Sequence, residues 1–398
     1  MFEISDIFIE EKSVLKEGKD LLITDTDKPV ISFQLQSDRR ETSLRSACIR
    51  VNNWIAEVKE QIGVKYEGEP LKPFTQYDVE IEAADDRGNY STRCVKFMTG
   101  RKNLPWNGKW ITDKTHVTEK PKSPRPLYFR RKIHLEKAVQ ESWLVFTAIG
   151  IFDVLLDGRR ICEDYFSPGF TSYEHNLQYC CYRTGELQEG DHELFVTVAA
   201  GWAVGRTTNI SNTNQSVSLL TADRQALLTE WYVVYKDEIR EVVSTDETFE
   251  VTADGPYQYA DFYDGEIYDA RFKETERKWR KADVITPDIH PMIEARYGEP
   301  VTGHEIFVPI SCEEISSGEK GETEIIYDFG QNISGVVEFE AEGETGQIIR
   351  ICHAEALEHG KLYRTNLRSA KQEICYYCRA GKQTYAPHFT YMGFRYIS

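Results

Sequence analysis

The stretch Tyr327-Asp328-Phe329-Gly330-Gln331-Asn332-Ile333-Ser334-Gly335 is the most distinctive run in the chain. Its glycines permit positive φ and its asparagine tolerates it, which favours a tight loop. Apolar side chains then alternate over residues 336–341 and predict a strand behind that loop. A glycine turn at 343–346 and a second strand-like run at 347–354 make a β-hairpin the simplest interpretation.

The composition indicates a β-rich globular protein of several domains. The chain has 398 residues, of which 40% are hydrophobic and 12% aromatic, with 22 Tyr and 19 Phe. This length exceeds one ordinary hydrophobic core, and tyrosine and phenylalanine favour strands. Short strand-like runs separated by turn residues recur along the chain. We therefore predict an all-β fold of tandem β-sandwich or jelly-roll domains, with helix only as short connectors.

The charge balance excludes two classes of partner. The formal net charge is −17, from 48 basic and 65 acidic residues. Such a chain repels nucleic acid and anionic membranes but is compatible with a neutral ligand such as a sugar. No apolar run approaches the roughly eighteen residues of a membrane span. We therefore predict neither a nucleic-acid nor a membrane partner.

The amino terminus and the cysteines indicate a cytoplasmic protein. Acidic residues occupy positions 3 and 6, where a signal peptide carries positive charge, and no apolar core follows. The nine cysteines are odd in number and scattered, which is typical of free thiols in a reducing compartment. Cys375 and Cys378 have the gap of a zinc pair, but no second pair has ligand spacing, so we interpret them as ordinary strand thiols.

Residues 1–104 are predicted to form the first domain. Strand-like runs lie at 30–35, 47–51, 76–83 and 92–98. The acidic stretch 85–89 carries the Gly-Asn pair of a hairpin turn. This order resembles a fibronectin type III module, and such modules usually serve as spacers.

Residues 105–297 are predicted to form the middle domain, after a boundary near Leu104-Pro105-Trp106-Asn107-Gly108 and a polar, proline-rich linker. Strand-like runs lie at 127–133, 145–156 and 227–235. Asp157-Gly158 is typical of a type I′ hairpin.

The carboxyl-terminal motifs resemble a known family. They are Asp328-Phe329-Gly330-Gln331-Asn332, His353-Ala354-Glu355, Asn366-Leu367-Arg368 and Phe389-Thr390-Tyr391-Met392-Gly393-Phe394-Arg395-Tyr396. In this order they resemble the β-domain that precedes the catalytic barrel in bacterial α-L-rhamnosidases. The resemblance implies a third domain over 298–398. It also implies loop geometry and interdomain packing, rather than chemistry, for Asp328, Gln331, Asn332, His353 and Glu355.

The middle domain carries further motifs of that resemblance. Segments 164–173, 201–206 and 261–272 are similar to the amino-terminal jelly-roll domain of these enzymes. Two departures stand out, because Phe170 occupies a position where Trp is usual and Ala203 one where Tyr is usual.

The densest set of carboxylates in the chain consists of Asp261, Asp264, Glu266 and Asp269. Two carboxyl groups flanking a sugar can act as acid and base, and carboxylate oxygens also bind Ca²⁺. The set lacks the spacing of an EF-hand loop, and Arg271 offers an ion-pair partner. We favour a structural or interface role, and leave open a ligand contact, a Ca²⁺ site and catalysis. No other metal or cofactor is predicted.

A sugar platform is a further hypothesis for Trp202, Arg206 and Tyr165. Aromatic faces stack on the C–H surface of a pyranose, and a guanidinium donates to hydroxyls. The alternative is a core tryptophan behind a glycine turn.

The resemblance places the acid and the base of the family in an (α/α)₆ barrel, at an Asp-Glu-Arg-x-Gly-Trp motif that this sequence does not contain. We therefore expect the non-catalytic amino-terminal portion of an α-L-rhamnosidase-like glycoside hydrolase, truncated at Ser398 and inactive alone. The expected partner is the absent barrel or a partner chain. A carbohydrate-binding accessory protein with a rhamnose-containing glycan as ligand, and a module that docks on a catalytic partner, are the alternatives.

Overall fold

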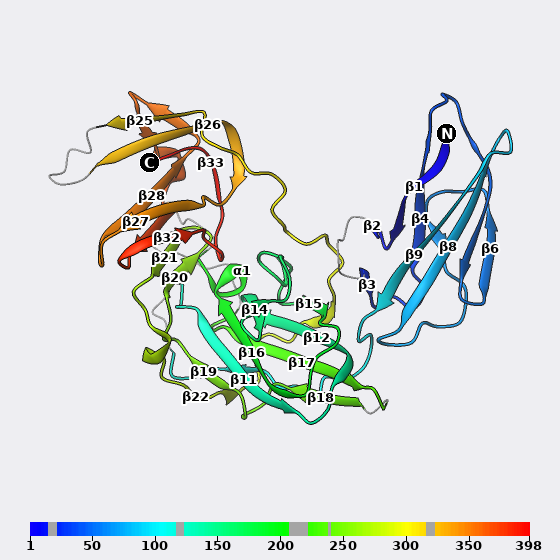
Figure 1. Cartoon of the computed structure of the whole chain (residues 1–398), viewed down its shortest axis with the longest axis horizontal. Helices are drawn as coiled ribbons and strands as arrows, with labels where there is room; N and C mark the ends of the chain where they lie inside the picture. Colours follow the sequence, from blue (N-terminus) through cyan, green and yellow to red (C-terminus); the bar gives the residue numbers. More distant parts are fainter. Residues whose placement is uncertain (15–21, 117–122, 207–221, 238–239, 316–322) are drawn as a thin grey trace.

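The computed structural model describes residues 1–14, 22–116, 123–206, 222–237, 240–315 and 323–398. Within these residues strand makes up 54% and helix 3%. Three β-rich bodies follow one another along the chain, from blue through green to red in Figure 1. The predicted all-β fold of tandem sandwiches is therefore confirmed.

The first sandwich packs a four-stranded sheet, of order β2-β1-β4-β7, against a five-stranded sheet of order β3-β9-β8-β5-β6. Its strands are β1 (Phe2–Ile9), β2 (Lys12–Ser13), β3 (Leu22–Thr24), β4 (Val30–Ser37), β5 (Leu44–Val51), β6 (Trp54–Val58), β7 (Val64–Lys65), β8 (Gln76–Asp85) and β9 (Tyr90–Thr99). All four strands expected here are present. The predicted hairpin turn joins β8 to β9, where the Asp85 carboxylate accepts from the N–H groups of Arg87 and Asn89 at 2.9 and 2.8 Å.

The middle sandwich packs sheet β23-β10-β17-β12-β15-β24, with β18 paired to β17, against sheet β14-β13-β16-β11-β19-β22. Its strands are β10 (Ile111–Thr112), β11 (Leu127–Leu135), β12 (Val139–Ile149), β13 (Ile151–Leu156), β14 (Arg159–Arg160), β15 (Asn176–Arg183), β16 (Gly190–Ala199), β17 (Ala226–Tyr235), β18 (Arg240–Ser244), β19 (Glu250–Thr252), β22 (Arg280–Lys281), β23 (Asp283–Val284) and β24 (Met292–Ala295). The short helix α1 (Gly201–Val204) follows β16, and the 3₁₀ turn η1 (Glu274–Glu276) precedes β22.

The run predicted as one strand over 145–156 is in fact divided between the two middle sheets. The chain turns the corner at Gly150, whose φ is +130°. A Cβ there would lie 2.3 Å from the carbonyl oxygen of Ala199, so only glycine fits this corner. The type I′ hairpin is confirmed, since Asp157 and Gly158 have φ of +51° and +75°.

The third sandwich has a seven-stranded sheet of order β20-β21-β31-β28-β33-β26-β25, faced by the pair β27-β32. Its strands are β20 (Tyr257–Asp261), β21 (Gly265–Asp269), β25 (Ser311–Ile315), β26 (Glu324–Gly335), β27 (Phe339–Gly343), β28 (Ile348–Ala354), β31 (Glu373–Tyr377), β32 (Gly381–Tyr385) and β33 (Met392–Ile397). The small pair β29 (Ala356–Glu358) and β30 (Lys361–Tyr363) and the 3₁₀ turn η2 (Thr365–Leu367) complete it.

Two details of the third sandwich differ from the sequence predictions. The predicted hairpin of 336–341 with 347–354 is wrong, because β27 pairs with β32 while β28 pairs with β31 and β33. The predicted loop at 327–335 lies within β26, with an irregular register between Asp328 and Ile333. Of its two glycines and its asparagine, only Gly330 has positive φ, at +81°.

The hairpin β20–β21 connects the middle and third sandwiches. It lies between β19 and β22 of the middle sandwich in sequence, yet β21 runs parallel to β31 and extends the third sheet. The main-chain N–H of Tyr257 in this hairpin donates to the hydroxyl of Tyr128 on β11, at 3.1 Å. We call β20, β21 and their connecting turn the acidic hairpin, since it carries the four carboxylates singled out above.

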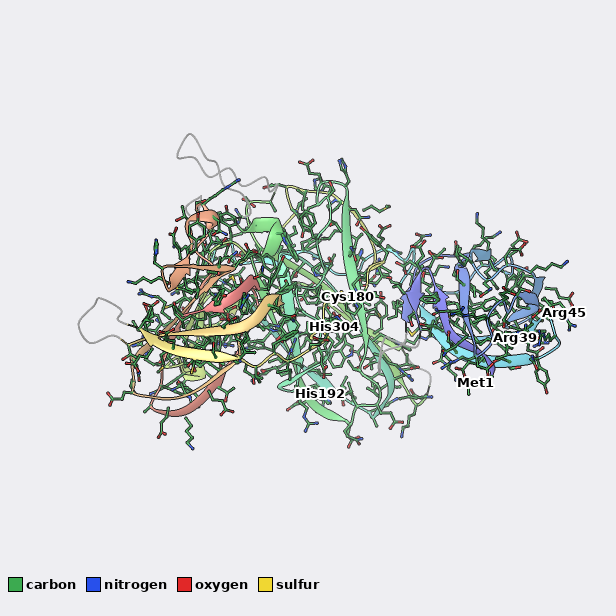
Figure 2. All side chains as sticks on the ribbon, turned by 90° about the horizontal axis from the view of Figure 1, so that it is seen from above. Met1, Arg39, Arg45, Cys180, His192 and His304 are labelled. Atoms are coloured by element: carbon green, nitrogen blue, oxygen red, sulfur yellow. The ribbon has the colours of Figure 1, made fainter. Side chains whose placement is uncertain are left out.

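The first sandwich is attached to the middle one by polar contacts. The Asp25 carboxylate accepts from the Tyr179 hydroxyl at 2.5 Å and from the Ala295 N–H at 3.1 Å. Arg101 and Glu230 form a buried ion pair at 3.3 Å. In Figure 2 this sandwich carries the labels Met1, Arg39 and Arg45. It projects to one side of the other two sandwiches.

No helix among the described residues has the length and apolar character that crossing a membrane requires.

Candidate functional site

Glu266 is the most deeply buried carboxyl group of the acidic hairpin. Its exposed fraction is 0%, and it accepts hydrogen bonds from the Tyr385 hydroxyl and from the Phe389 N–H, the latter at 3.0 Å. Burial raises its pKa to about 7, and the two hydrogen bonds oppose that rise. Glu266 thus joins β21 to the end of β32 and to the segment that follows it.

Asp261 occupies a similar position at the end of β20, where it is 1% exposed. One carboxylate oxygen accepts from the N–H groups of Tyr263 and Asp264 at 2.7 and 2.9 Å, which closes the turn of the hairpin. The other accepts from the Ser123 hydroxyl and from the Arg206 N–H at 2.7 Å. Burial raises the pKa of Asp261, against the effect of these donors.

The remaining two carboxylates of the hairpin form ion pairs. Asp264 lies 3.1 Å from the Arg206 guanidinium, and both side chains are mostly buried. Asp269 is held by Arg271 through two hydrogen bonds of 2.8 and 2.7 Å, which lower the pKa of Asp269. All four carboxylates therefore have partners within the protein.

Trp202 lies in an aromatic cluster between the sandwiches. Its ring stacks on Phe262 of the acidic hairpin, with centroids 4.2 Å apart. Phe166 and Phe170 meet it edge-on at 6.2 and 5.8 Å. Phe170, one of the two departures from the family pattern, is 65% exposed, and Tyr391 beside Phe262 is 38% exposed. The cluster thus has a buried side toward the hairpin and an exposed side.

Arg206 and Tyr165 are engaged with different neighbours. The Arg206 guanidinium pairs with Asp264, donates to the Ser369 carbonyl and lies 4.6 Å from the Tyr263 ring centroid. Tyr165 packs on His388, with ring centroids 5.0 Å apart. The structure brings Trp202 and Arg206 to the same hairpin, and brings Tyr165 to the aromatic cluster through Phe166.

The conspicuous motif at 328–332 lies on the third sandwich. Arg395 donates two hydrogen bonds to Asp328, at 2.8 and 2.9 Å, and lowers its pKa. Gln331 and Asn332 are exposed. Their predicted role in packing against another domain stays a prediction.

His353 and Glu355 do not form a pair. His353 is 1% exposed, its Nδ1 lies 2.9 Å from the Gln372 carbonyl oxygen, and burial lowers its pKa to about 4. Glu355 is exposed, and Asn366 donates to it at 3.5 Å. The predicted packing role of these two residues is likewise untested.

Several partners of the site were missed from the sequence. His388 lies 3.4 Å from Asp153 of β13, which links the third sandwich to the middle one. Ser123 and Tyr385 bind the hairpin carboxylates. Their separations of 138 and 119 residues from those carboxylates leave no local signal, although His388 directly precedes the motif that begins at Phe389.

Within the described parts of the chain no group of three or more His, Cys, Asp or Glu side chains is arranged to hold a metal ion. The donors around the acidic hairpin are hydroxyl, N–H and guanidinium groups, which occupy the oxygens that a Ca²⁺ ion would need. The Ca²⁺ hypothesis stays a prediction.

Comparison with family models gives three consecutive matches. Residues 15–102 match a Rha78A-like N-terminal immunoglobulin domain, an architecture that fibronectin type III modules share. Residues 137–305 match the α-L-rhamnosidase N-terminal domain, and residues 318–398 match the bacterial α-L-rhamnosidase concanavalin-like domain. The chain is built from amino-terminal α-L-rhamnosidase domains.

Curated relatives of these rhamnosidase domains are longer proteins. An α-L-rhamnosidase of Alteromonas sp. (strain LOR) is 31% identical over 314 residues, which are 74% of this chain and 32% of the relative. An α-L-rhamnosidase of Formosa agariphila is 28% identical over 433 residues, which are 98% of this chain and 45% of the relative. The chain therefore spans less than half the length of either relative.

Solved structures share the arrangement of the rhamnosidase domains. The α-L-rhamnosidase of Aspergillus terreus matches with a TM-score of 0.85 at 23% identity, over 100% of this chain and 47% of that one. The Streptomyces avermitilis α-L-rhamnosidase, solved in complex with L-rhamnose, matches with a TM-score of 0.80 at 20% identity, over 100% of this chain and 56% of that one. At this level of identity the likeness shows the fold.

Proposed function

We propose that this chain serves as the non-catalytic amino-terminal portion of an α-L-rhamnosidase-like glycoside hydrolase, a family whose reaction is hydrolysis of terminal α-L-rhamnose residues. The observation that carries the proposal is the use of all four acidic-hairpin carboxylates in contacts within the protein. In this role the hairpin holds the middle and third sandwiches together. The role requires no metal or cofactor.

The chemistry of glycoside hydrolysis supports this assignment. The reaction needs a carboxylic acid that protonates the leaving oxygen and a carboxylate on the opposite face of the sugar. Glu266 and Asp261 are 0% and 1% exposed, so a glycosidic bond does not reach them. Helix makes up 3% of the described residues, so these residues contain no helical barrel that places such a pair elsewhere.

An exposed apolar segment supports docking on a catalytic barrel or a partner chain. In the connection between β24 and β25, Ile306, Val308 and Ile310 are 96%, 74% and 70% exposed. Phe307, in the same connection, is 36% exposed. Clustered exposed apolar side chains are typical of interaction surfaces.

The test is incubation of the purified chain with an aryl α-L-rhamnoside. We expect no release of the aryl group above buffer. Turnover that is abolished by Asp264→Asn or Glu266→Gln would contradict the proposal. Trace turnover that both variants retain would indicate a contaminating enzyme, which repurification must remove.

Carbohydrate binding is a second candidate function, because the aromatic cluster has an exposed side. Phe170 and Tyr391 are 65% and 38% exposed around the half-buried Trp202. Aromatic faces of this kind bind the C–H surface of sugars. A rhamnose-containing glycan is the proposed ligand. Arg206 contributes to binding of this glycan only indirectly, since its guanidinium already pairs with Asp264. Loss of sugar binding in a folded Trp202→Ala variant would support this function.

A further inference from the structure

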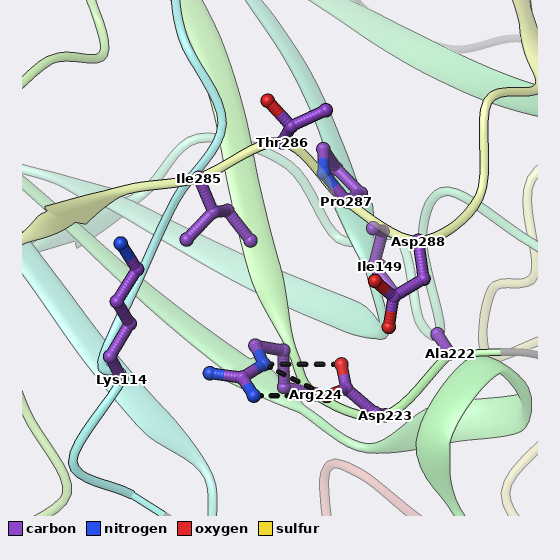
Figure 3. Close-up of a pocket in the computed structure, with 9 residues that line it drawn as sticks. All are labelled: Lys114, Ile149, Ala222, Asp223, Arg224, Ile285, Thr286, Pro287 and Asp288. Carbon is purple, nitrogen blue, oxygen red and sulfur yellow. Dashed lines mark hydrogen bonds and ion pairs between the residues drawn. The ribbon is translucent and has the colours of Figure 1, made fainter.

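A pocket on the middle sandwich combines an apolar wall with polar groups, and none of its residues belongs to the acidic hairpin (Figure 3). Its volume is about 320 Å³, within the range of small-ligand sites. Ile149, at the end of β12, is buried at 2% exposure and forms part of the wall. Ile285 and Pro287, which follow β23, are half-buried and complete it.

The polar groups of the pocket include both hydrogen-bond donors and hydrogen-bond acceptors. Arg224 holds Asp223 through hydrogen bonds of 3.1 Å from Nε and 2.9 Å from Nη2. This pairing fixes the direction of the guanidinium while its Nη1 remains directed away from Asp223 (Figure 3). Lys114 lies on one side of Arg224 in this view, and the Asp288 carboxylate lies on the other.

The charges within the pocket cancel, which decides the class of ligand. Lys114 and Arg224 are balanced by Asp223 and Asp288. The chain as a whole has a formal net charge of −17, which disfavours an anion further. A neutral molecule with several hydroxyl groups satisfies both kinds of polar group, because each hydroxyl both donates and accepts. Its C–H surface then faces the isoleucine and proline wall.

We propose that this pocket binds a neutral pyranose sugar, with hydroxyl groups toward Lys114 and Asp288 and an apolar face on Ile285 and Pro287. The site is separate from the aromatic cluster at Trp202. L-rhamnose is the probe, a choice that rests on the proposed function. D-glucuronate is the matched probe, since it is a pyranose of similar size that carries a negative charge.

The experiment is titration of L-rhamnose into the full chain, followed by chemical shifts and by calorimetry. We expect saturable binding in the millimolar range, with D-glucuronate at least about tenfold weaker. Lys114→Met and Asp288→Ala each remove a charged hydrogen-bonding group from an exposed rim, so each is expected to weaken L-rhamnose about tenfold without unfolding the protein. Lys59→Met, an exposed lysine on the first sandwich, is the control and leaves binding unchanged.

Three results would overturn the proposal. The first is the absence of saturable L-rhamnose binding, and the second is equal or tighter binding of D-glucuronate. The third is binding that survives both pocket variants and disappears in Trp202→Ala, which would assign the sugar to the aromatic cluster instead. Each of these results is independent of the aryl rhamnoside assay. Failure of the sugar-binding proposal therefore does not contradict the proposed non-catalytic role.

Discussion

The two junctions between sandwiches accommodate a buried carboxylate in different ways. Between the first and middle sandwiches, Glu230 is 0% exposed and pairs with Arg101, whose side chain is 3% exposed. The Gly108 N–H also donates to Glu230, at 3.0 Å. In the acidic hairpin, Glu266 is equally buried, but it accepts hydrogen bonds from the Tyr385 hydroxyl and the Phe389 N–H.

The difference lies in what compensates the charge. An arginine in contact with a buried carboxylate offsets much of the cost of burying it, whereas the hydrogen bonds of Glu266 and the nearby His388 offset only part of that cost. Burial accordingly raises the pKa of Glu266 to about 7. The hairpin junction is therefore expected to respond to pH near neutrality, and the Arg101–Glu230 junction to respond to loss of either partner.

The largest expected effect comes from removing the cation of the first junction. Arg101→Met leaves Glu230 buried without its counter-charge, and such changes cost about 3–5 kcal/mol of the free energy of unfolding. Denaturant unfolding of the wild type and the variant measures it. The double variant Arg101→Met with Glu230→Gln is the control, and we expect it to recover most of the loss. If Arg101→Met alone is as stable as the wild type, the proposed difference between the two junctions is wrong.

The next effect is the pH dependence that Glu266 imposes. Its pKa is raised from 4.5 in the unfolded chain to about 7 in the folded one, so the folded state binds the proton more tightly. The free energy of unfolding therefore falls as pH rises from 4.5 to 7, by about 3 kcal/mol from this group. Burial raises the pKa of Asp261 as well, which adds to the same trend.

Glu266→Gln removes this titration and tests it. We expect the variant to lose stability less steeply than the wild type between pH 5 and pH 7, in thermal or denaturant unfolding at matched salt. Parallel pH profiles of the two proteins would show that Glu266 ionises in the folded state as it does in the unfolded one, contrary to the account.

A smaller effect distinguishes two arginines of the hairpin junction. Arg206 is mostly buried and contacts Asp264 and Ser369, so Arg206→Met is expected to cost about 1–3 kcal/mol of unfolding free energy. Arg271 pairs with Asp269 at the surface, with 42% of its side chain exposed, and Arg271→Met is expected to leave stability unchanged within error. Equal losses in the two variants would contradict the burial argument.

Local chemistry decided which parts of the fold were predictable. Asp157-Gly158 was recognised as a type I′ turn because this turn requires positive φ at both central residues, and the Asp-Gly pair is favoured there. The choice of strand partners is not local, since β27 pairs with β32 some forty residues later rather than with the adjacent β28. The sandwich corner at Gly150 depends on the closeness of Ala199, which the sequence does not display.

The candidate site shows the same limit. The four hairpin carboxylates were found because they are dense in sequence, but two of them, Asp261 and Glu266, have partners more than a hundred residues away in Ser123, Tyr385 and Phe389. Trp202 was found as a conspicuous residue, whereas its stacking on Phe262 required the structure. Sequence thus identified the residues of the site, and packing determined what they do.

The most direct test of the structural role of the acidic hairpin is a site-resolved titration of Glu266. The side-chain carboxyl of glutamate is labelled with ¹³C, and the Glu266 signal is assigned by its absence in Glu266→Gln. The account predicts a folded-state pKa of about 7, because the cost of full burial exceeds the opposing effects of its hydrogen bonds and of nearby His388. A pKa near or below 4.5 would mean that this carboxyl is solvated or paired with a cation, and would contradict the account.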